Sequence, residues 1–301
     1  MSRRKFTWTD AQKDKLYKVL DILEELKAYQ PLTLRQVYYQ MVGKGYIENT
    51  KPQYQMLSGL IKWARIEGYI PWEIIEDRVR AFHDFSGWET KEDFIGQELK
   101  GFLAGYRRDL LQTQEKYLET WIEKDALSSL FSKVCMGYTV PVVVCRGFSS
   151  VSFLNDFKER LARKAGKAPV MLYFGDFDPS GVEMLEAMKI TLGEELGVED
   201  ITFKRIALLR GDISTYNLPH SPFALKKTDT RARKHIARYG ELAVELDALR
   251  PDILERKIKD AIEGEIDAGA FNKELRRANL ELRKLKEIKA KTEAFIRDLN
   301  V

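Results

Sequence analysis

Two aspartates, Asp176 and Asp178, stand one residue apart where an apolar run of residues ends and the chain turns toward a helix. The run, residues 169–175, predicts a short buried strand, so both carboxylates follow its carboxyl end. Open α/β sheets bind ligands at that end of their strands. Side chains two positions apart in an extended segment point the same way, and paired carboxylates suit Mg²⁺. Taken alone, the pair fits a magnesium site and an ordinary acidic turn equally well.

A third carboxylate, Glu123, favours the magnesium site. Residues 117–122 alternate in a strand-like pattern, Glu123 follows them, and a helix is expected to begin near Lys124. Between the two acidic strands, residues 140–145 predict another strand and residues 150–167 an amphipathic helix. The sequence therefore predicts consecutive strand-helix units, two of which carry acid at the carboxyl end of the strand.

The amino-terminal segment predicts helices over residues 8–29, 34–42 and 52–65, with Thr33 as the N-cap of the second helix. Residues 68–78 predict a short hairpin or wing. Helix-turn-helix proteins with this pattern commonly place the third helix in the major groove of DNA. Small helical packing domains share the pattern, so DNA binding is favoured over that alternative without being required.

The second of these helices carries a tyrosine that can face a ligand. Tyr38 falls on the apolar stripe with Val37 and Met41, which predicts a packing role. Tyr39 is turned about 100° away from that stripe, on the side of Arg35, four residues earlier. Taken alone, Tyr39 is most simply interpreted as an exposed aromatic that contacts DNA or the next domain.

The overall composition favours a globular protein of two domains over a disulfide-rich, zinc-binding or membrane protein. The chain has 301 residues with 44% hydrophobic content, which suits two domains. Fifty Lys and Arg against 46 acids give a net charge of +4, a weak argument for nucleic acid. Two cysteines and three scattered histidines offer neither a disulfide scaffold nor zinc spacing. With no apolar span or signal core, we expect a soluble cytoplasmic protein without membrane contact, whose metal is bound by oxygen.

The order of strands and acids resembles the Toprim domain of topoisomerases, primases and related nucleases. Glu123, Asp176 and Asp178 match the acidic triad of that family in residue type, strand position and order. Phe177 departs from the pattern, because relatives often carry a smaller residue there. The resemblance implies a Rossmann-like domain with a mainly parallel sheet.

An amino-terminal winged helix carrying an Arg-x-x-Tyr-Tyr motif, followed by a Toprim domain, resembles the A subunit of type IIB topoisomerases (topoisomerase VI). The meiotic double-strand-break transesterase is a relative of that subunit. The resemblance spans residues 30–250. Further stretches at 146–149, 216–219, 227–231 and 245–249 are similar to the short, stand-alone Mini-A members of this group.

The resemblance implies a role for each candidate site residue. Tyr39 matches the nucleophile, Arg35 the nearby basic residue, and Glu123, Asp176 and Asp178 the Mg²⁺ ligands. It further implies cleavage of double-stranded DNA through a tyrosyl-phosphate adduct. The implied homodimer brings the tyrosine of one subunit to the metal site of its partner. True topoisomerases of this family need a separate ATPase (B-type) subunit, and this sequence has no Walker-type loop of its own.

These patterns together predict an α/β protein in four segments. A winged-helix (CAP-like) domain spans residues 1–80, a helical linker 81–112, a Toprim domain 113–268 and a carboxyl-terminal helix 269–301. A fourth strand is expected over residues 201–209. The last helix has an apolar face, which predicts packing on the Toprim domain or pairing with a second subunit.

For several other charged residues, the sequence favours a structural role over a functional one or does not decide between the two. We expect Lys124 to be a surface lysine without special function, and Glu245 and Asp247 to be structural acids rather than extra metal ligands. A basic stretch fits a solvated loop and a DNA contact equally well. Its members are Lys226, Lys227, Arg231, Arg233, Lys234 and Arg238.

Two other functions remain open beside tyrosine transesterification. A Toprim nuclease would use the same metal site to hydrolyse DNA with water and would leave no protein–DNA adduct. A non-catalytic winged-helix DNA-binding protein would keep the Toprim domain only as a dimerisation scaffold. Bound metal ions and the chemistry of the product ends separate these alternatives.

Overall fold

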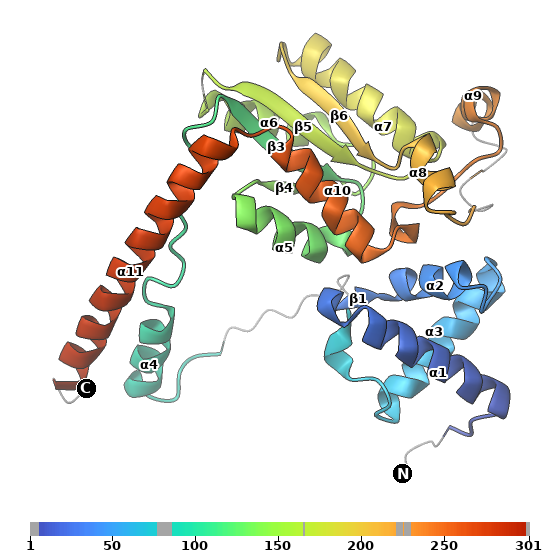
Figure 1. The fold of residues 1–301 in the computed structure, drawn as a ribbon, viewed down its shortest axis with the longest axis horizontal. Helices are drawn as coiled ribbons and strands as arrows, with labels where there is room; N and C mark the ends of the chain where they lie inside the picture. Colours follow the sequence, from blue (N-terminus) through green and yellow to red (C-terminus); the bar gives the residue numbers. More distant parts are fainter. Residues whose placement is uncertain (1–5, 77–85, 165, 221–224, 226–229, 299–301) are drawn as a thin grey trace.

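The computed structural model shows an α/β protein in which a helical amino-terminal unit packs against a second unit built on a parallel sheet (Figure 1). Within the described residues, the larger sheet has four parallel strands in the order β4 (Val142–Val144), β3 (Lys116–Ile122), β5 (Ala168–Phe174) and β6 (Thr202–Ala207). The structure describes residues 6–76, 86–164, 166–220, 225 and 230–298.

The two central strands of this sheet are covered on both faces. Helices α5 (Ser128–Tyr138) and α10 (Pro251–Glu263) lie on one face, and α6 (Val151–Ala162) and α7 (Pro179–Ile190) lie on the other (Figure 1). Strands β3 and β5 therefore bury all but their first residues, instead of alternating between core and solvent. The strand over 201–209 is confirmed as β6, and the strand over 140–145 is confirmed in the shorter form of β4.

The helical unit follows the sequence pattern closely. It contains α1 (Asp10–Glu25), α2 (Leu34–Gly43) and α3 (Lys51–Ile66). Each helix begins after a threonine whose hydroxyl accepts a hydrogen bond from the backbone amide three residues later, which satisfies one of the free amides at the helix start. These caps are Thr9, Thr33 and Thr50.

The described residues do not form the hairpin expected after α3. Trp72–Ile74 make a single 3₁₀ turn, and β2 (Ile75–Glu76) then pairs in parallel with β1 (Leu32–Thr33). The end of the expected hairpin, residues 77–78, lies outside the described residues. Strand β2 pairs with the distant β1 instead of a neighbouring strand, because Ile75 and Leu32 are buried in the same apolar cluster.

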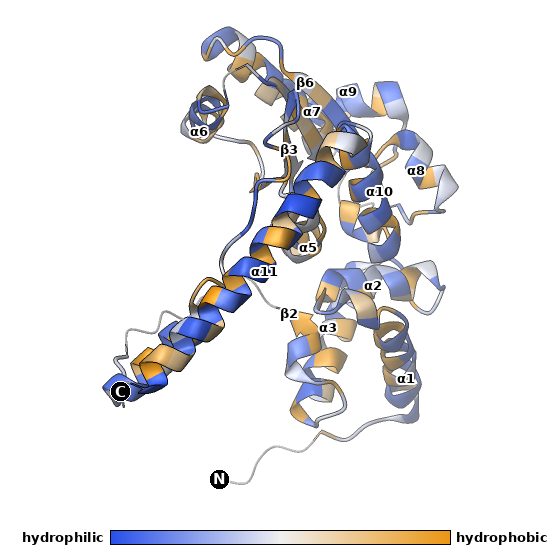
Figure 2. Ribbon diagram, turned by 60° about the vertical axis from the view of Figure 1, so that its left-hand side comes forward, coloured by the Kyte–Doolittle hydropathy of each residue, from blue (hydrophilic) through white to orange (hydrophobic). Residues whose placement is uncertain are grey.

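The last helix, α11 (Ala268–Asp298), leaves the sheet and extends away from it with α4 (Lys91–Gly101) alongside (Figures 1 and 2). Lys289 donates to the backbone carbonyl of Lys100 at 2.6 Å, which joins α11 to the carboxyl end of α4. Most of α11 therefore does not pack on the α/β unit, contrary to one of the two expectations. Helix α4 lies within residues 81–112, the segment for which a helical linker was expected.

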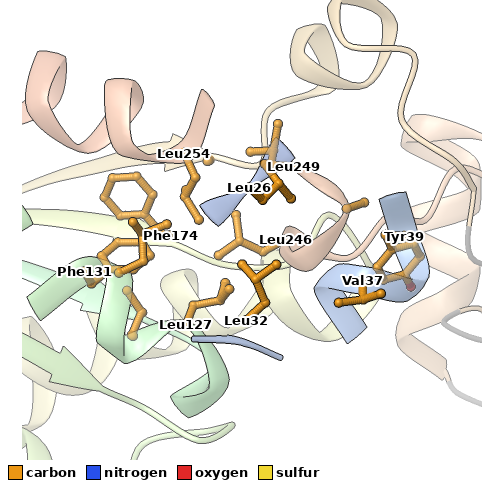
Figure 3. Packing of buried hydrophobic residues seen from close by; sticks show 14 of the residues in the cluster. Leu26, Leu32, Val37, Tyr39, Leu127, Phe131, Phe174, Leu246, Leu249 and Leu254 are labelled. Carbon is orange, nitrogen blue, oxygen red and sulfur yellow. The ribbon is translucent and has the colours of Figure 1, made fainter. Parts of the chain in front are cut away.

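The two units share one apolar cluster, which fixes how they face each other. Leu32 and Val37 of the helical unit approach Leu246 and Leu249, which follow β6 in the chain (Figure 3). Helix α2 contacts the 3₁₀ turn Leu246–Ala248 directly. In the described parts of the chain, no helix is both long enough and apolar enough to cross a bilayer.

Candidate active site at the junction of the two units

The three predicted acids meet at the carboxyl edge of the sheet. Glu123 follows β3 and Asp176 follows β5, and these strands are hydrogen-bonded neighbours. One oxygen of Glu123, Oε2, accepts a hydrogen bond from the backbone amide of Asp176 at 2.9 Å. Asp178 is the N-cap of α7, and its Oδ1 accepts from the amide of Gly181 at 2.7 Å. The positions expected for Glu123 and Asp176 at the ends of neighbouring strands are confirmed, whereas their role stays a prediction.

Glycine is required at position 181 because the site is crowded. A Cβ atom there would lie 2.3 Å from the backbone oxygen of Asp176 and 3.0 Å from Oε2 of Glu123. A side chain would thus push directly against two of the three acids. Gly181 allows α7 to begin close to the strand end, and the sequence alone indicated only a turn there.

The acids carry more negative charge than their surroundings neutralise. Burial, reinforced by the neighbouring charge of Asp176, raises the pKa of Glu123 to about 8. Burial also raises the pKa of Asp176 to about 6, although Lys124 and the amide of Leu246 act in the opposite direction. Both shifts are caused mainly by burial, which disfavours the ionised carboxylates more than Lys124 and the backbone amides favour them.

The donor chemistry of these acids suits Mg²⁺, but their arrangement is not yet that of a metal site. Among the described residues, no group of three His, Cys, Asp or Glu side chains is placed to hold a metal ion. Glu123 and Asp178 each direct one oxygen to a backbone amide instead. Oxygen-only donors with excess negative charge are what a hard divalent cation requires. The residues therefore fit such a cation in chemistry, and ligation by all three would require their carboxylates to turn.

Lys124 is the main correction to the sequence analysis. Its side chain is only 18% exposed rather than solvated. The Nζ atom lies 3.0 Å from Oδ2 of Asp176, 2.9 Å from Oε2 of Glu245 and 2.9 Å from Oδ2 of Asp247. The expected surface lysine is therefore the centre of a carboxylate cluster.

Glu245 and Asp247 reach the site through a long-range backbone contact. Val244 pairs with Phe177 in an antiparallel bridge, which brings the following residues against the strand end. The amide of Leu246 then donates to Oδ1 of Asp176 at 2.8 Å. This segment is a single bridge followed by a 3₁₀ turn, and no local sequence signal reveals its position.

Tyr39 belongs to the buried apolar cluster and is not the exposed aromatic that its helical position predicted. The α/β unit covers it, so the residue is only 4% accessible to solvent. Burial raises the pKa of Tyr39, and Glu245 raises it further, whereas Lys124 and Arg35 lower it. Arg35 forms an ion pair with Glu245, which joins the two units beside the tyrosine. Lys124, which was expected to be a surface lysine without special function, lowers the pKa of Tyr39 more than Arg35 does.

A cavity of about 720 Å³, here called the junction cavity, opens between the two units. It is lined by both cations and acids. From the helical unit come Arg35, Tyr54, Lys62 and Arg65, and from the α/β unit Glu123, Lys124, Arg146 and Asp247. Tyr39 is not among its lining residues and borders a separate cavity of about 330 Å³. The sequence analysis missed Tyr54, because nothing in the spacing of α3 shows which of its side chains faces the acids.

The basic stretch is only partly described. Lys226 and Lys227 lie outside the described residues. The remaining basic residues belong to α9 (Thr230–Tyr239), where Arg233, Lys234 and Arg238 are exposed. Its guanidinium and ammonium groups therefore form a solvated face, and the DNA contact stays a prediction.

Comparison with known proteins identifies no relative: no family model matches the chain, and no curated protein matches it. The fold and the site thus define a class in physical terms. It is an α/β protein whose acidic strand ends share a cavity with the cations of a packed helical unit.

Proposed function

We propose that this protein is a Mg²⁺-dependent enzyme, similar to the topoisomerase VI A subunit, that cuts duplex DNA by tyrosine transesterification. In this proposal the helical unit is the winged-helix domain and the α/β unit is the Toprim domain. The observation that carries it is the junction cavity, where Glu123 lies in one opening with cations from both units. Acids for a metal and cations for a phosphate are what phosphodiester chemistry needs together.

The proposed reaction exchanges one phosphoester bond for another. The Tyr39 oxygen forms a bond to the scissile phosphorus, and the bond from phosphorus to the sugar oxygen breaks, which leaves a tyrosyl phosphate and a free sugar hydroxyl. A phenol with a reference pKa of about 10 is a weak nucleophile at neutral pH. Lys124 and Arg35 are the groups that favour its phenolate. Glu123, Asp176 and Asp178 would hold Mg²⁺, which when bound neutralises charge on the phosphate.

The cations at the rim of the cavity suit the DNA backbone. Lys62 and Arg65 lie on α3, and Arg146 lies on the loop after β4. The Arg146 side chain is 72% exposed and reaches Oδ2 of Asp125 at 2.8 Å, so it is available to phosphate without loss of a buried pair. Phosphate contacts of this kind position a duplex without selecting its sequence.

The burial of Tyr39 requires a movement before the reaction. The phenol is covered by the turn Leu246–Ala248 and sits beside the Arg35–Glu245 ion pair. Separation of the two units at this contact exposes the phenol to DNA. In the proposed homodimer, the phenol then meets the acidic site of the second subunit, and an ATPase subunit supplies any ATP-driven step.

One observation favours a second candidate function. Glu123 lines the junction cavity, whereas Tyr39 does not. A nuclease that hydrolyses DNA with water needs only the acids to be accessible, so it requires no rearrangement of α2. The two candidates therefore differ in whether the tyrosine is used.

The decisive experiment is incubation with supercoiled plasmid and Mg²⁺, followed by denaturing gels with and without protease. We expect cleaved DNA bound to protein, loss of both cleavage and adduct in Glu123→Ala, and loss of the adduct in Tyr39→Phe. Tyr38→Phe is the matched control, because Tyr38 lies in the same helix and is equally buried. Cleavage without any adduct supports the nuclease, and an adduct lost only in Tyr54→Phe assigns the nucleophile to the cavity tyrosine instead.

A further inference from the structure

The surroundings of Lys124 are those of a bound cation. An ammonium group has three N–H donors, and here a carboxylate oxygen lies within 3.0 Å of Nζ in each of Asp176, Glu245 and Asp247. The side chain is largely buried, so water supplies little of its solvation. The lysine thus occupies a pocket built from oxygen donors of three separate residues.

Asp247 supplies an independent sign that this pocket is a cation position. Its side chain is completely buried, and while Oδ2 contacts Lys124, the other oxygen, Oδ1, has no hydrogen-bond partner among the described residues. Both oxygens belong to one carboxylate, so the unpartnered atom lies within the same cluster. A buried charged oxygen without a partner is costly unless a cation stands close by.

Asp176 belongs to two groups of acids at once. On one side it adjoins Glu123, whose Oε2 accepts from its amide. On the other side its Oδ2 faces Lys124. A carboxylate shared between two cation positions is typical of two-metal sites, where the ions lie about 3.5–4 Å apart.

The balance of charge decides how many divalent ions such a site accepts. Its carboxylates are Glu123, Asp176, Asp178, Glu245 and Asp247. The neighbouring cations are Lys124, Arg35 and Arg205. With every group ionised, five negative charges face three positive ones, so two negative charges remain. One divalent ion balances that remainder, and a second would overshoot it.

We propose that Lys124 is a built-in second cation, so the site takes one divalent ion beside Glu123 and an ammonium in place of another. This inference rests on the proposed function for the first ion. The spacing agrees with it, because oxygens 2.9–3.0 Å from Nζ suit an ammonium, whereas Mg²⁺ needs about 2.0–2.1 Å. Lys124 lines the junction cavity, so its positive charge also faces the position proposed for the phosphate.

The test is the number of Mn²⁺ ions bound per chain, counted by electron paramagnetic resonance of free Mn²⁺ during titration of the full-length protein. Wild type is expected to bind one ion and Lys124→Met two, because removal of the ammonium opens its pocket. Lys124→Met/Asp247→Asn removes a pocket oxygen together with the ammonium and is expected to bind one. Lys189→Met is the matched control, since Lys189 pairs with Glu186 on α7 and lies over the ring of Phe203, away from the acidic cluster.

A second measurement compares Mn²⁺ affinities and does not need Lys124→Met, the variant that leaves buried acids without their ammonium partner. Asp247→Asn retains Lys124 and is expected to change the affinity for the single Mn²⁺ little, whereas Glu123→Gln weakens it at least about tenfold. The inference is overturned if Lys124→Met binds one Mn²⁺ ion or if the wild-type protein binds two. It is also overturned if Asp247→Asn and Glu123→Gln lose Mn²⁺ affinity equally. If the wild-type protein binds no Mn²⁺ and Lys124→Met binds one, the metal position beside Glu123 is refuted and the cation position at Lys124 is supported. Absence of a DNA adduct, read separately, would count against the proposed function alone.

Discussion

Glu119 lies in β3 and Glu123 directly follows it, four residues later, yet their carboxylates have opposite surroundings. Glu119 is completely buried within β3 and is held by the Arg160 guanidinium at 2.7 and 3.0 Å. Tyr117 and Trp121 donate to it as well, at 2.5 and 2.9 Å. Every oxygen of this carboxylate has strong donors, so its charge is neutralised where it stands.

Glu123 lies where the strand ends and receives far less compensation. It accepts one backbone hydrogen bond, and its neighbours Asp176 and Asp178 are themselves acidic. The difference shows that burial alone does not tell whether the charge of a carboxylate is compensated. A buried carboxylate with a complete set of donors stabilises the fold, whereas one with fewer donors is the kind that the proposed metal site requires. Three predictions test this contrast, beginning with the largest effect.

Glu119→Ala should cause the largest loss of stability, because it strips the half-buried Arg160 of its partner. Removal of one member of a buried ion pair typically costs about 3–5 kcal/mol. Urea unfolding followed by circular dichroism measures this, with Glu159→Ala on the exposed face of α6 as control. An effect no larger than that of the control would mean that the contacts of Glu119 contribute little.

Gly181→Ala should have an intermediate effect that falls on the acidic site. The new methyl group meets the backbone of Asp176 and the carboxylate of Glu123, so we expect about 1–3 kcal/mol of destabilisation and weaker Mn²⁺ binding. Gly59→Ala is the matched control, because nothing lies within 4 Å of its added Cβ and alanine favours the helix. Unchanged Mn²⁺ affinity in Gly181→Ala would separate Glu123 from the metal.

The pH dependence of stability tests the contrast through the charge of Glu123 itself, without a change in packing. The pKa of Glu123 is raised from an ordinary value of 4.5 to about 8, so between these values the folded protein keeps a proton that the unfolded chain releases. Stability without metal should therefore fall as pH rises from 4.5 to 8, and Glu123→Gln should flatten that slope. Thermal unfolding in a chelating buffer measures it. Parallel curves for the two proteins would contradict the raised pKa.

Much of this architecture followed from local patterns in the sequence. The threonine caps, the apolar strands and the acids at strand ends are encoded within a few residues, so Thr33, Glu123 and Asp176 were placed correctly. The surroundings of Lys124 depend on Glu245 and Asp247, more than a hundred residues away, and no local pattern reveals that contact. The same holds for Tyr39, whose helical position was right but whose covering comes from the other unit. The described part of the expected wing differs for a related reason, since β2 pairs with a distant segment rather than a neighbouring one.

Thr33 ends β1 and also caps α2, so a two-residue pairing and a helix start share one residue. The direction in which α2 leaves this joint determines where its tyrosine points. Helix α2 therefore cannot turn about its own axis unless Leu32–Thr33 separates from Ile75–Glu76 or the cap breaks. Substitutions in this small joint would redirect the phenol without touching it, and Thr33, Ile75 and Glu76 line the same junction cavity as Glu123.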